Sequence, residues 1–144
     1  MAIRAVYLST IAHSTEDESK VRAALAGLTP PQLRGSLEIT SSAAEGHHGN
    51  RIVLIQAVVN EKGAAREAVD YMLKILPVGD RLRLKDRIST FYDGQSNVFI
   101  RLSKQMAFLG TARLSDEDDV IRVRIGLNVR KNDLSSVLEA LALS

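Results

Sequence analysis

The sequence contains no cysteine. This absence excludes disulfide bonds, catalytic thiols and cysteine-ligated zinc sites, and it is typical of a protein that is not built for an oxidising compartment. We therefore expect a cytoplasmic protein. With only three prolines and nine glycines the chain has no linker-like segment, and its 45% hydrophobic content can form a core without metals or disulfides. The sequence predicts one domain over residues 1–144.

Long hydrophobic runs are also missing. The longest apolar stretch, residues 52–59, is interrupted by Gln56 and is far shorter than the roughly 20 residues that a membrane helix needs. The apolar N-terminal residues are interrupted by Arg4, unlike the continuous apolar core of a signal peptide. We expect neither a membrane segment nor a signal peptide.

The motifs of common catalytic sites are absent as well. The sequence has no G-x-S-x-G nucleophile elbow, no Walker loop, no G-x-G-x-x-G fingerprint and no H-E-x-x-H motif. We expect a protein that is not an enzyme and that holds no cofactor and no metal.

The spacing of apolar residues predicts strands interrupted by helices. Strands are expected at residues 3–11, 36–42, 51–60, 97–103 and 120–129, and helices at residues 16–26, from 61 to the proline at 77, and after 133. The second and third strands are expected to pair as antiparallel neighbours. This order is typical of an α+β fold, with a mainly antiparallel sheet and helices packed on one face.

Local signals mark the ends of several elements. Thr15 and Glu18 have the spacing of a capping box at the start of the first helix, and Gly27 is placed to end it. Asp133 is the expected N-cap of the last helix. The alternation of residues 81–88 fits a strand. Their apolar spacing, with Asp80 as an N-cap, fits a short helix, and we favour the helix.

Positive charge is distributed unevenly along the chain. The net charge is only +2, but residues 81–130 contain ten Lys or Arg against six Asp or Glu. Within residues 120–130, the odd positions from 121 to 129 are apolar, whereas basic side chains stand at even positions. Because neighbouring strand residues point to opposite faces, this alternation predicts one buried and one basic face. We expect Arg101, Arg122 and Arg124 on the face that the helices leave open.

Basic side chains at these positions favour contact with a nucleic-acid backbone, because guanidinium and ammonium groups bind phosphates. The alternative is an ordinary solvated sheet face. Aromatic residues make up only 4% of the sequence, and of Tyr92, Phe99 and Phe108 we single out Phe99, which shares a strand face with Arg101. This scarcity favours recognition of backbone or shape, and hence structured or double-stranded RNA. The candidate RNA contacts are Arg101, Lys104, Gln105, Arg113, Arg122 and Arg124.

The segment at residues 46–51 is a second candidate contact. Its glycines allow a ligand to approach the backbone closely, and its candidate phosphate or base contacts are His47, His48, Asn50 and Arg51. Acid–base cleavage of RNA by His47 or His48 beside Glu45 is an alternative, and so is a polar hairpin turn without a binding role. A zinc site lacks further ligands here, since the other histidine of the chain is His13.

Two charged runs have a plain and a functional interpretation. The acidic residues at 116–119 are potential cation ligands, but they fit a solvated turn better, and they could orient nearby arginines. The basic residues between 81 and 87 fit a solvated helix face better than a second RNA contact.

Three segments, EGHHGNRI at 45–52, VFIRLSKQMAFLG at 98–110 and DDVIRVRI at 118–125, resemble in order and spacing an archaeal RNA-binding family of predicted exosome subunits. The end of the first strand and the residues after it, 13–18, are similar to the start of that family. The resemblance implies one α+β domain similar in fold to the ribosomal protein that binds 5S RNA. It also implies RNA binding and a link to RNA processing.

We therefore expect an RNA-binding protein that presents a basic sheet face to the RNA backbone. The alternative is a protein-interaction module, such as an accessory subunit of an RNA-processing complex or a homodimer, with that sheet face buried against its partner. Arginines beside Gly126 and Asn128 on the open face favour RNA. An open face that carried Val98, Ile100 and Leu102 would favour a protein partner.

Overall fold

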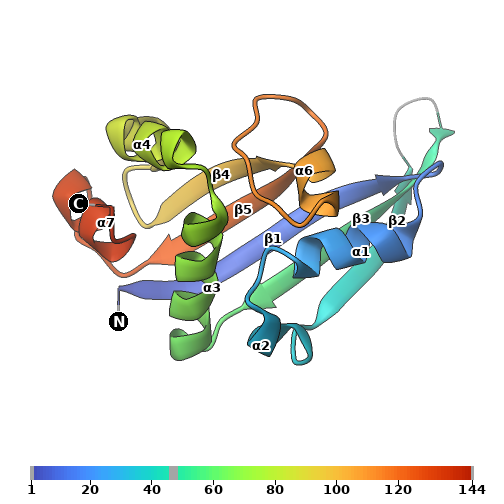
Figure 1. Ribbon diagram of the computed structural model, residues 1–144, viewed down its shortest axis with the longest axis horizontal. Coiled ribbons are helices and arrows are strands. Elements are labelled where there is room, and N and C mark those ends of the chain that lie inside the picture. The colour runs from blue at the N-terminus through green and yellow to red at the C-terminus, as the bar shows by residue number, and fades with distance from the viewer. Residues whose placement is uncertain (1, 46–48, 144) are drawn as a thin grey trace.

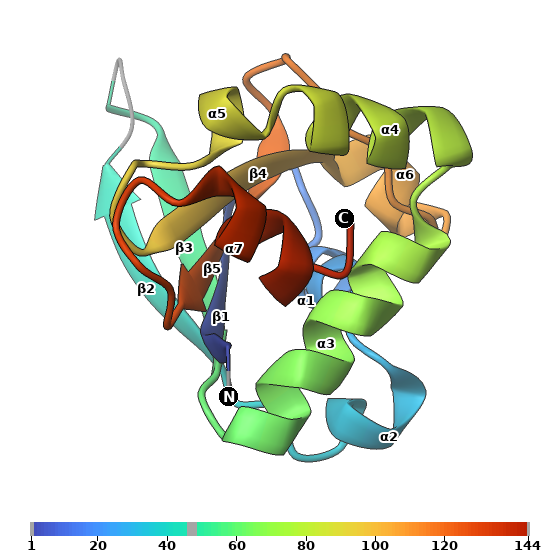
Figure 2. The same ribbon diagram turned by 90° about the vertical axis from the view of Figure 1, so that its left-hand side faces the viewer.

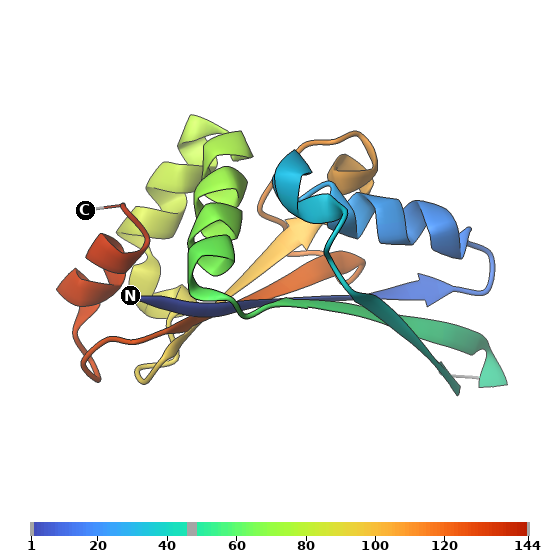
Figure 3. The ribbon, with the colours of Figure 1, turned by 90° about the horizontal axis from the view of Figure 1, so that it is seen from below.

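A computed structural model describes residues 2–45 and 49–143 of the chain. Within these residues, five strands form one sheet in the order β2-β3-β1-β5-β4, and the helices cover one of its faces (Figures 1 and 3). All neighbouring strands are antiparallel, which confirms the predicted α+β fold. The strands are β1 (Ile3–His13), β2 (Ile39–Glu45), β3 (Arg51–Val59), β4 (Asn97–Ser103) and β5 (Val120–Leu127). The helices are α1 (Glu18–Ala26), α2 (Pro31–Arg34), α3 (Lys62–Ile75), α4 (Val78–Asp86), α5 (Ile88–Phe91), α6 (Lys104–Phe108) and α7 (Leu134–Ala140).

The hydrophobic core lies between the sheet and the helices, which stand together on one side of the strands (Figure 2). Val6 and Leu8 of β1 are buried on this side, and α3 contributes Val69 and Met72 from its predicted apolar stripe. The aliphatic residues of β4 are buried in the same core: Val98, Ile100 and Leu102. They are therefore not available to form an apolar open face.

Strands β2 and β3 pair as the sequence predicted, but β2 begins later than expected, at Ile39. The reason is the turn after α2, where the Ser36 N–H donates to Leu33 O and keeps the chain out of the sheet. Strand β4 has the predicted bounds, and β5 ends at Leu127 instead of residue 129.

The start of α1 differs from the predicted capping box. Asp17 is the N-cap, and its carboxylate accepts from the Ser19 N–H at 2.9 Å. The Ser19 hydrogen bonds hold the pKa of Asp17 below its ordinary value of 3.8. Glu16 lies before the helix and accepts from the His13 N–H at 3.0 Å. Its carboxylate therefore serves the end of β1 rather than the first turn of the helix.

The ambiguous residues 81–88 are helical for most of their length, within α4 and the start of α5. Asp80 is not the N-cap, because α4 begins two residues earlier, after Pro77. The Asp80 carboxylate instead accepts from the Leu114 N–H at 3.0 Å. It therefore ties α4 to the segment after α6. The predicted N-cap of α7 is confirmed, since Asp133 accepts from the Ser136 N–H.

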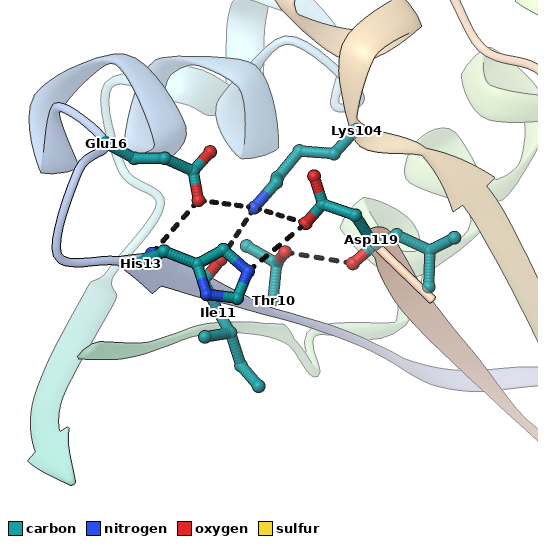
Figure 4. Close-up of polar contacts among 7 residues, drawn as sticks. Thr10, Ile11, His13, Glu16, Lys104 and Asp119 are labelled. Atoms are coloured by element: carbon teal, nitrogen blue, oxygen red, sulfur yellow. Dashed lines mark hydrogen bonds and ion pairs between the residues drawn. The ribbon is translucent and has the colours of Figure 1, made fainter. Parts of the chain in front are cut away.

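Lys104 is fully buried at the start of α6, where its ammonium group joins three parts of the fold (Figure 4). The Nζ atom donates to Ile11 O of β1 at 2.7 Å and to Glu16 Oε1 at 2.9 Å, and it lies 2.7 Å from Asp119 Oδ1, which precedes β5. The expectation that Lys104 contacts RNA is therefore wrong. A buried ammonium needs such compensation, because burial without partners costs several kcal/mol.

The turn before β4 is organised by Asp93. Its Oδ1 accepts from the backbone N–H groups of Gln95, Ser96 and Asn97 at 2.9 to 3.0 Å. Partial burial by itself would raise the pKa of Asp93, but the hydrogen bonds from Asn97, Gln95 and Ser96 outweigh it and hold the pKa below 3.8. The charged carboxylate therefore stabilises this turn.

Within the described part of the chain, no helix is long and apolar enough to cross a membrane.

The first prediction concerns the buried ammonium. In the Lys104→Met variant, the Glu16 and Asp119 carboxylates and Ile11 O lose their shared donor. Both carboxylates keep some contact with water, so we expect the free energy of unfolding to fall by about 3 kcal/mol, the lower end for a broken buried ion pair. Urea unfolding measures this value. Lys85→Ala, at an exposed position of α4, is the control and should change it by less than about 0.5 kcal/mol. Equal stability of the two variants would contradict a structural role for Lys104.

The second prediction concerns pH. The folded Asp93 carboxyl has a lowered pKa, so its contribution to stability is complete above the unfolded value and is lost as the pH falls through the lower folded value. We expect Asp93→Asn to be less stable than the wild type at neutral pH, and the difference to shrink as the pH falls below about 4. Urea midpoints of both proteins across this range measure the effect. A difference that stays constant with pH would contradict it.

Candidate nucleic-acid interface

The sheet face opposite the helices is not covered by any described residue (Figure 3). We call it the open face. Alternate residues of the strands point to it, and the register places them in rows across the sheet. Within the described part of the chain, no Asp or Glu stands at an open-face strand position. The centre of the open face is formed by Tyr7, Ser9, Gln56, Val58, Phe99, Arg101, Arg122 and Arg124.

Two arginines stand directly opposite each other on this face. Arg101 of β4 is paired in register with Arg122 of β5. Like charges at opposite positions of neighbouring strands destabilise a sheet unless an anion lies near them. Arg122 is exposed, and its side chain has neither an ion pair nor a hydrogen bond among the described residues. Arg122 is therefore a cation without a counter-charge among the described residues, directly beside a second arginine.

The acidic residues before β5 lie at the border of the open face. Arg101 donates to Glu117 O, and its guanidinium lies 4.0 Å from the Asp118 carboxylate. Two further acidic side chains of this run pair with bases of the helix side: Asp116 lies 3.3 Å from Arg83, and Asp119 contacts Lys104. The run thus orients basic side chains, as the sequence suggested.

The guanidinium of Arg124 stacks on an aromatic ring. It lies 3.8 Å from the centroid of the Tyr7 ring, which faces it from β1. On its other side, Arg124 is paired in register with Phe99 of β4. A stacked guanidinium keeps its charge and all its N–H donors for an incoming anion. Phe99 shares a face with Arg101, as predicted, and 49% of its surface is exposed.

A fourth arginine reaches the open face through an irregularity in β1. The register shifts between Ile3 and Ala5, which makes Arg4 an additional residue in that strand. A Cβ at Gly126, on the open face of β5, would lie 2.7 Å from the Arg4 guanidinium. The Arg4 side chain therefore extends over Gly126 and donates to Leu127 O at 3.1 Å. Regular alternation places residue 4 on the opposite side from Tyr7, so the sequence pattern did not predict this contribution.

The remaining predicted contacts are dispersed over the molecule. Gln105 is exposed on α6, and Arg113 lies 3.9 Å from Asp80 of α4, so both are on the helix side. Asn50 and Arg51 are exposed at the start of β3, where Arg51 stands opposite Glu45 in the β2–β3 register. His47 and His48 lie outside the described residues. The structure therefore gathers Arg101, Arg122 and Arg124 but not the full predicted set.

A potential group of metal ligands lies around the buried lysine. One ligand atom from each of His13, Glu16 and Asp119 lies within 4.8 Å of the others. The Lys104 ammonium lies between the two carboxylates, as Figure 4 shows, and it supplies the positive charge that they need. This group is accounted for as an ion-pair cluster.

Three polar or aromatic residues at the centre of the open face were not expected as contacts: Tyr7, Ser9 and Gln56. Gln56 was visible in the sequence as the polar residue that interrupts an apolar strand. Tyr7 and Ser9 alternate with buried residues of β1. This alternation identifies their face, but their position beside Arg122 and Arg124 depends on the strand order, which the sequence does not specify.

Comparisons with known proteins identify the family of this chain and show the same overall fold. An RNA-binding protein of Pyrococcus abyssi is 29% identical to this chain over 136 residues, which cover 94% of this chain and 88% of the relative. A crystal structure of a DUF54 protein from Archaeoglobus fulgidus has a TM-score of 0.82 and 29% identity, and the match covers 99% of each chain. A DUF54 structure from Methanothermobacter thermautotrophicus has a TM-score of 0.78 and 25% identity over 99% of this chain and 97% of that one. A family model described as RNA binding matches residues 5–127. The chain therefore belongs to this RNA-binding family.

Proposed function

We propose that the protein binds RNA on the open face of its sheet, through phosphate contacts made by its arginines. The observation that carries this proposal is the pair formed by Arg101 and Arg122, two like charges in register on an uncovered face. A phosphate between them would remove their repulsion and gain charge-assisted hydrogen bonds. Arg124 and Arg4 extend the basic surface along β5 and β1.

The arginines of the open face support binding rather than catalysis. A guanidinium group donates hydrogen bonds but does not accept a proton in proteins. It can therefore hold a phosphate but cannot act as the base of a cleavage reaction. We propose a non-catalytic role, in which the sheet positions RNA.

Two further points stay predictions: the class of RNA that is bound and the cellular process in which the protein takes part. The small number of aromatic residues favours structured or double-stranded RNA, and the resemblance to predicted exosome subunits favours a role in RNA processing. The likeness to the ribosomal protein that binds 5S RNA is a prediction of the same kind.

A protein partner is the second candidate. Val58 and Phe99 are exposed on the open face, with 43% and 49% of their surfaces accessible, and exposed apolar residues on one face are typical of interaction sites. A homodimer or an accessory subunit would bury them. Light scattering after size-exclusion chromatography tests the homodimer, because a dimer that persists at high salt would favour this alternative over RNA.

The third prediction tests the arginines by salt dependence. We expect the wild type to bind RNA with an affinity that falls steeply with salt, because phosphate contacts release counterions. The Arg122→Ala/Arg124→Ala variant should lose about 0.7 per arginine from the log–log salt slope on single strands, and about 0.9 on duplexes. Fluorescence anisotropy across a salt series measures both quantities.

The control changes the net charge by the same amount on the other side of the molecule. Lys85 and Arg87 are exposed on the helix side, in and directly after α4. The Lys85→Ala/Arg87→Ala variant should bind RNA with nearly the affinity and slope of the wild type. If the two double variants lose affinity equally, general charge rather than the open face attracts RNA. If the wild type fails to bind at low salt, RNA binding by the isolated protein is disproved.

A further inference from the structure

The open face contains a hollow of about 480 Å³. It lies over the middle of the sheet, where β1, β5 and β4 are adjacent and β3 forms the far wall. Its side chains are both apolar and cationic, and it is therefore suited to a ligand that combines a flat apolar surface with negative charge. Its lining includes the rings of Tyr7 and Phe99 and the guanidinium groups of Arg101, Arg122 and Arg124.

One row of the hollow combines two aromatic rings with a planar guanidinium group. In register across the sheet, Phe99 is followed by Arg124, then Tyr7, then Val58. The Arg124 guanidinium already stacks on the Tyr7 ring at 3.8 Å. The Phe99 ring, about half exposed, has no such partner among the described residues. An accessible ring next to a planar cation is a surface on which another aromatic group can stack.

The neighbouring row is polar. Arg101 is followed by Arg122, then Ser9, Gln56 and Thr40. The side chains of Ser9 and Gln56 have no hydrogen-bond partner among the described residues. The Ser9 hydroxyl can donate and accept a hydrogen bond. The Gln56 side chain donates through its NH2 group and accepts through its carbonyl oxygen. The two arginines at the end of the row can hold a phosphate, while the hydroxyl and the amide face the hollow itself.

We propose that the hollow binds one unpaired RNA nucleotide, with its base stacked on Phe99 and its phosphate held by Arg101 and Arg122. This inference rests on the proposed function and narrows it to RNA that contains an unpaired base, in a single strand or in a bulge or loop of a structured RNA. A base inside a duplex is stacked on its neighbours and cannot offer its face to Phe99. A perfect duplex can therefore satisfy the arginines but not the hollow.

The fourth prediction uses two RNAs that differ in one feature: a perfect duplex and the same duplex with one bulged nucleotide. We expect the wild type to bind the bulged RNA about tenfold more tightly, within the range that one stacked base provides. Phe99→Leu keeps an apolar side chain but removes the ring. It should bind both RNAs with the affinity of the wild type for the perfect duplex, with an unchanged salt slope.

The matched control is Phe108→Leu, since Phe108 is a partly exposed phenylalanine of α6 on the helix side. It should keep the preference for the bulged RNA. A direct signal comes from 2-aminopurine at the bulge, whose fluorescence should be quenched by the wild type and by Phe108→Leu but not by Phe99→Leu. Adenosine monophosphate, added at the same concentration as the bulged RNA, should not displace that RNA from the wild type.

The possible failures are distinguishable. If the wild type binds both RNAs equally, or if Phe99→Leu and Phe108→Leu behave alike, the nucleotide site is disproved while RNA binding by the arginines stands. Displacement by adenosine monophosphate would also overturn the inference, in favour of a free-nucleotide site. If neither RNA binds at low salt, the proposed function fails together with this inference.

Discussion

The pairing of β1 on both of its edges is the constraint on which the rest of the structure depends. This strand is antiparallel to β3 on one side and to β5 on the other. Its alternation therefore decides which residues of the neighbouring strands share a face. Val6 and Leu8 turn toward the helices and begin the core. Tyr7 and Ser9 turn away from it, and the same register places them beside Arg124 and Arg122.

Basic side chains have two different environments in this fold: one is buried and lined by carboxylates, and the other is exposed on the open face. Lys104 is fully buried, and two carboxylates and a carbonyl satisfy its ammonium group. Such a group contributes to the fold and has no capacity for an external anion. Arg122 is exposed, stands opposite another arginine and has no described partner. A small net charge of +2 is therefore compatible with a locally basic face, because no Asp or Glu stands at a described open-face strand position and Asp118 reaches only Arg101 at its border.

The open face combines charge with flat apolar surface. Arginines alone would attract any polyanion, since phosphate contacts carry no sequence information. The row from Phe99 to Tyr7 adds aromatic rings beside the arginines, and Ser9 and Gln56 add hydrogen-bonding groups next to it. The acidic residues before β5 border this surface and hold Arg101 at its edge. Membership in an RNA-binding family agrees with this combination.

The sequence by itself determined the five strands, the longest helices and the faces that they bury. The alternation in β4 and β5 predicted that Arg101, Arg122 and Phe99 point away from the core, and the apolar stripe of α3 predicted its buried side. These features follow from local periodicity, which depends only on neighbouring residues. Only the tertiary structure decided which charges are compensated. Lys104 meets Ile11 and Asp119 across long separations in the chain, and the Arg4 side chain reaches the open face only because the register of β1 shifts. Strand order and bulges result from packing between distant segments, and no local pattern specifies them.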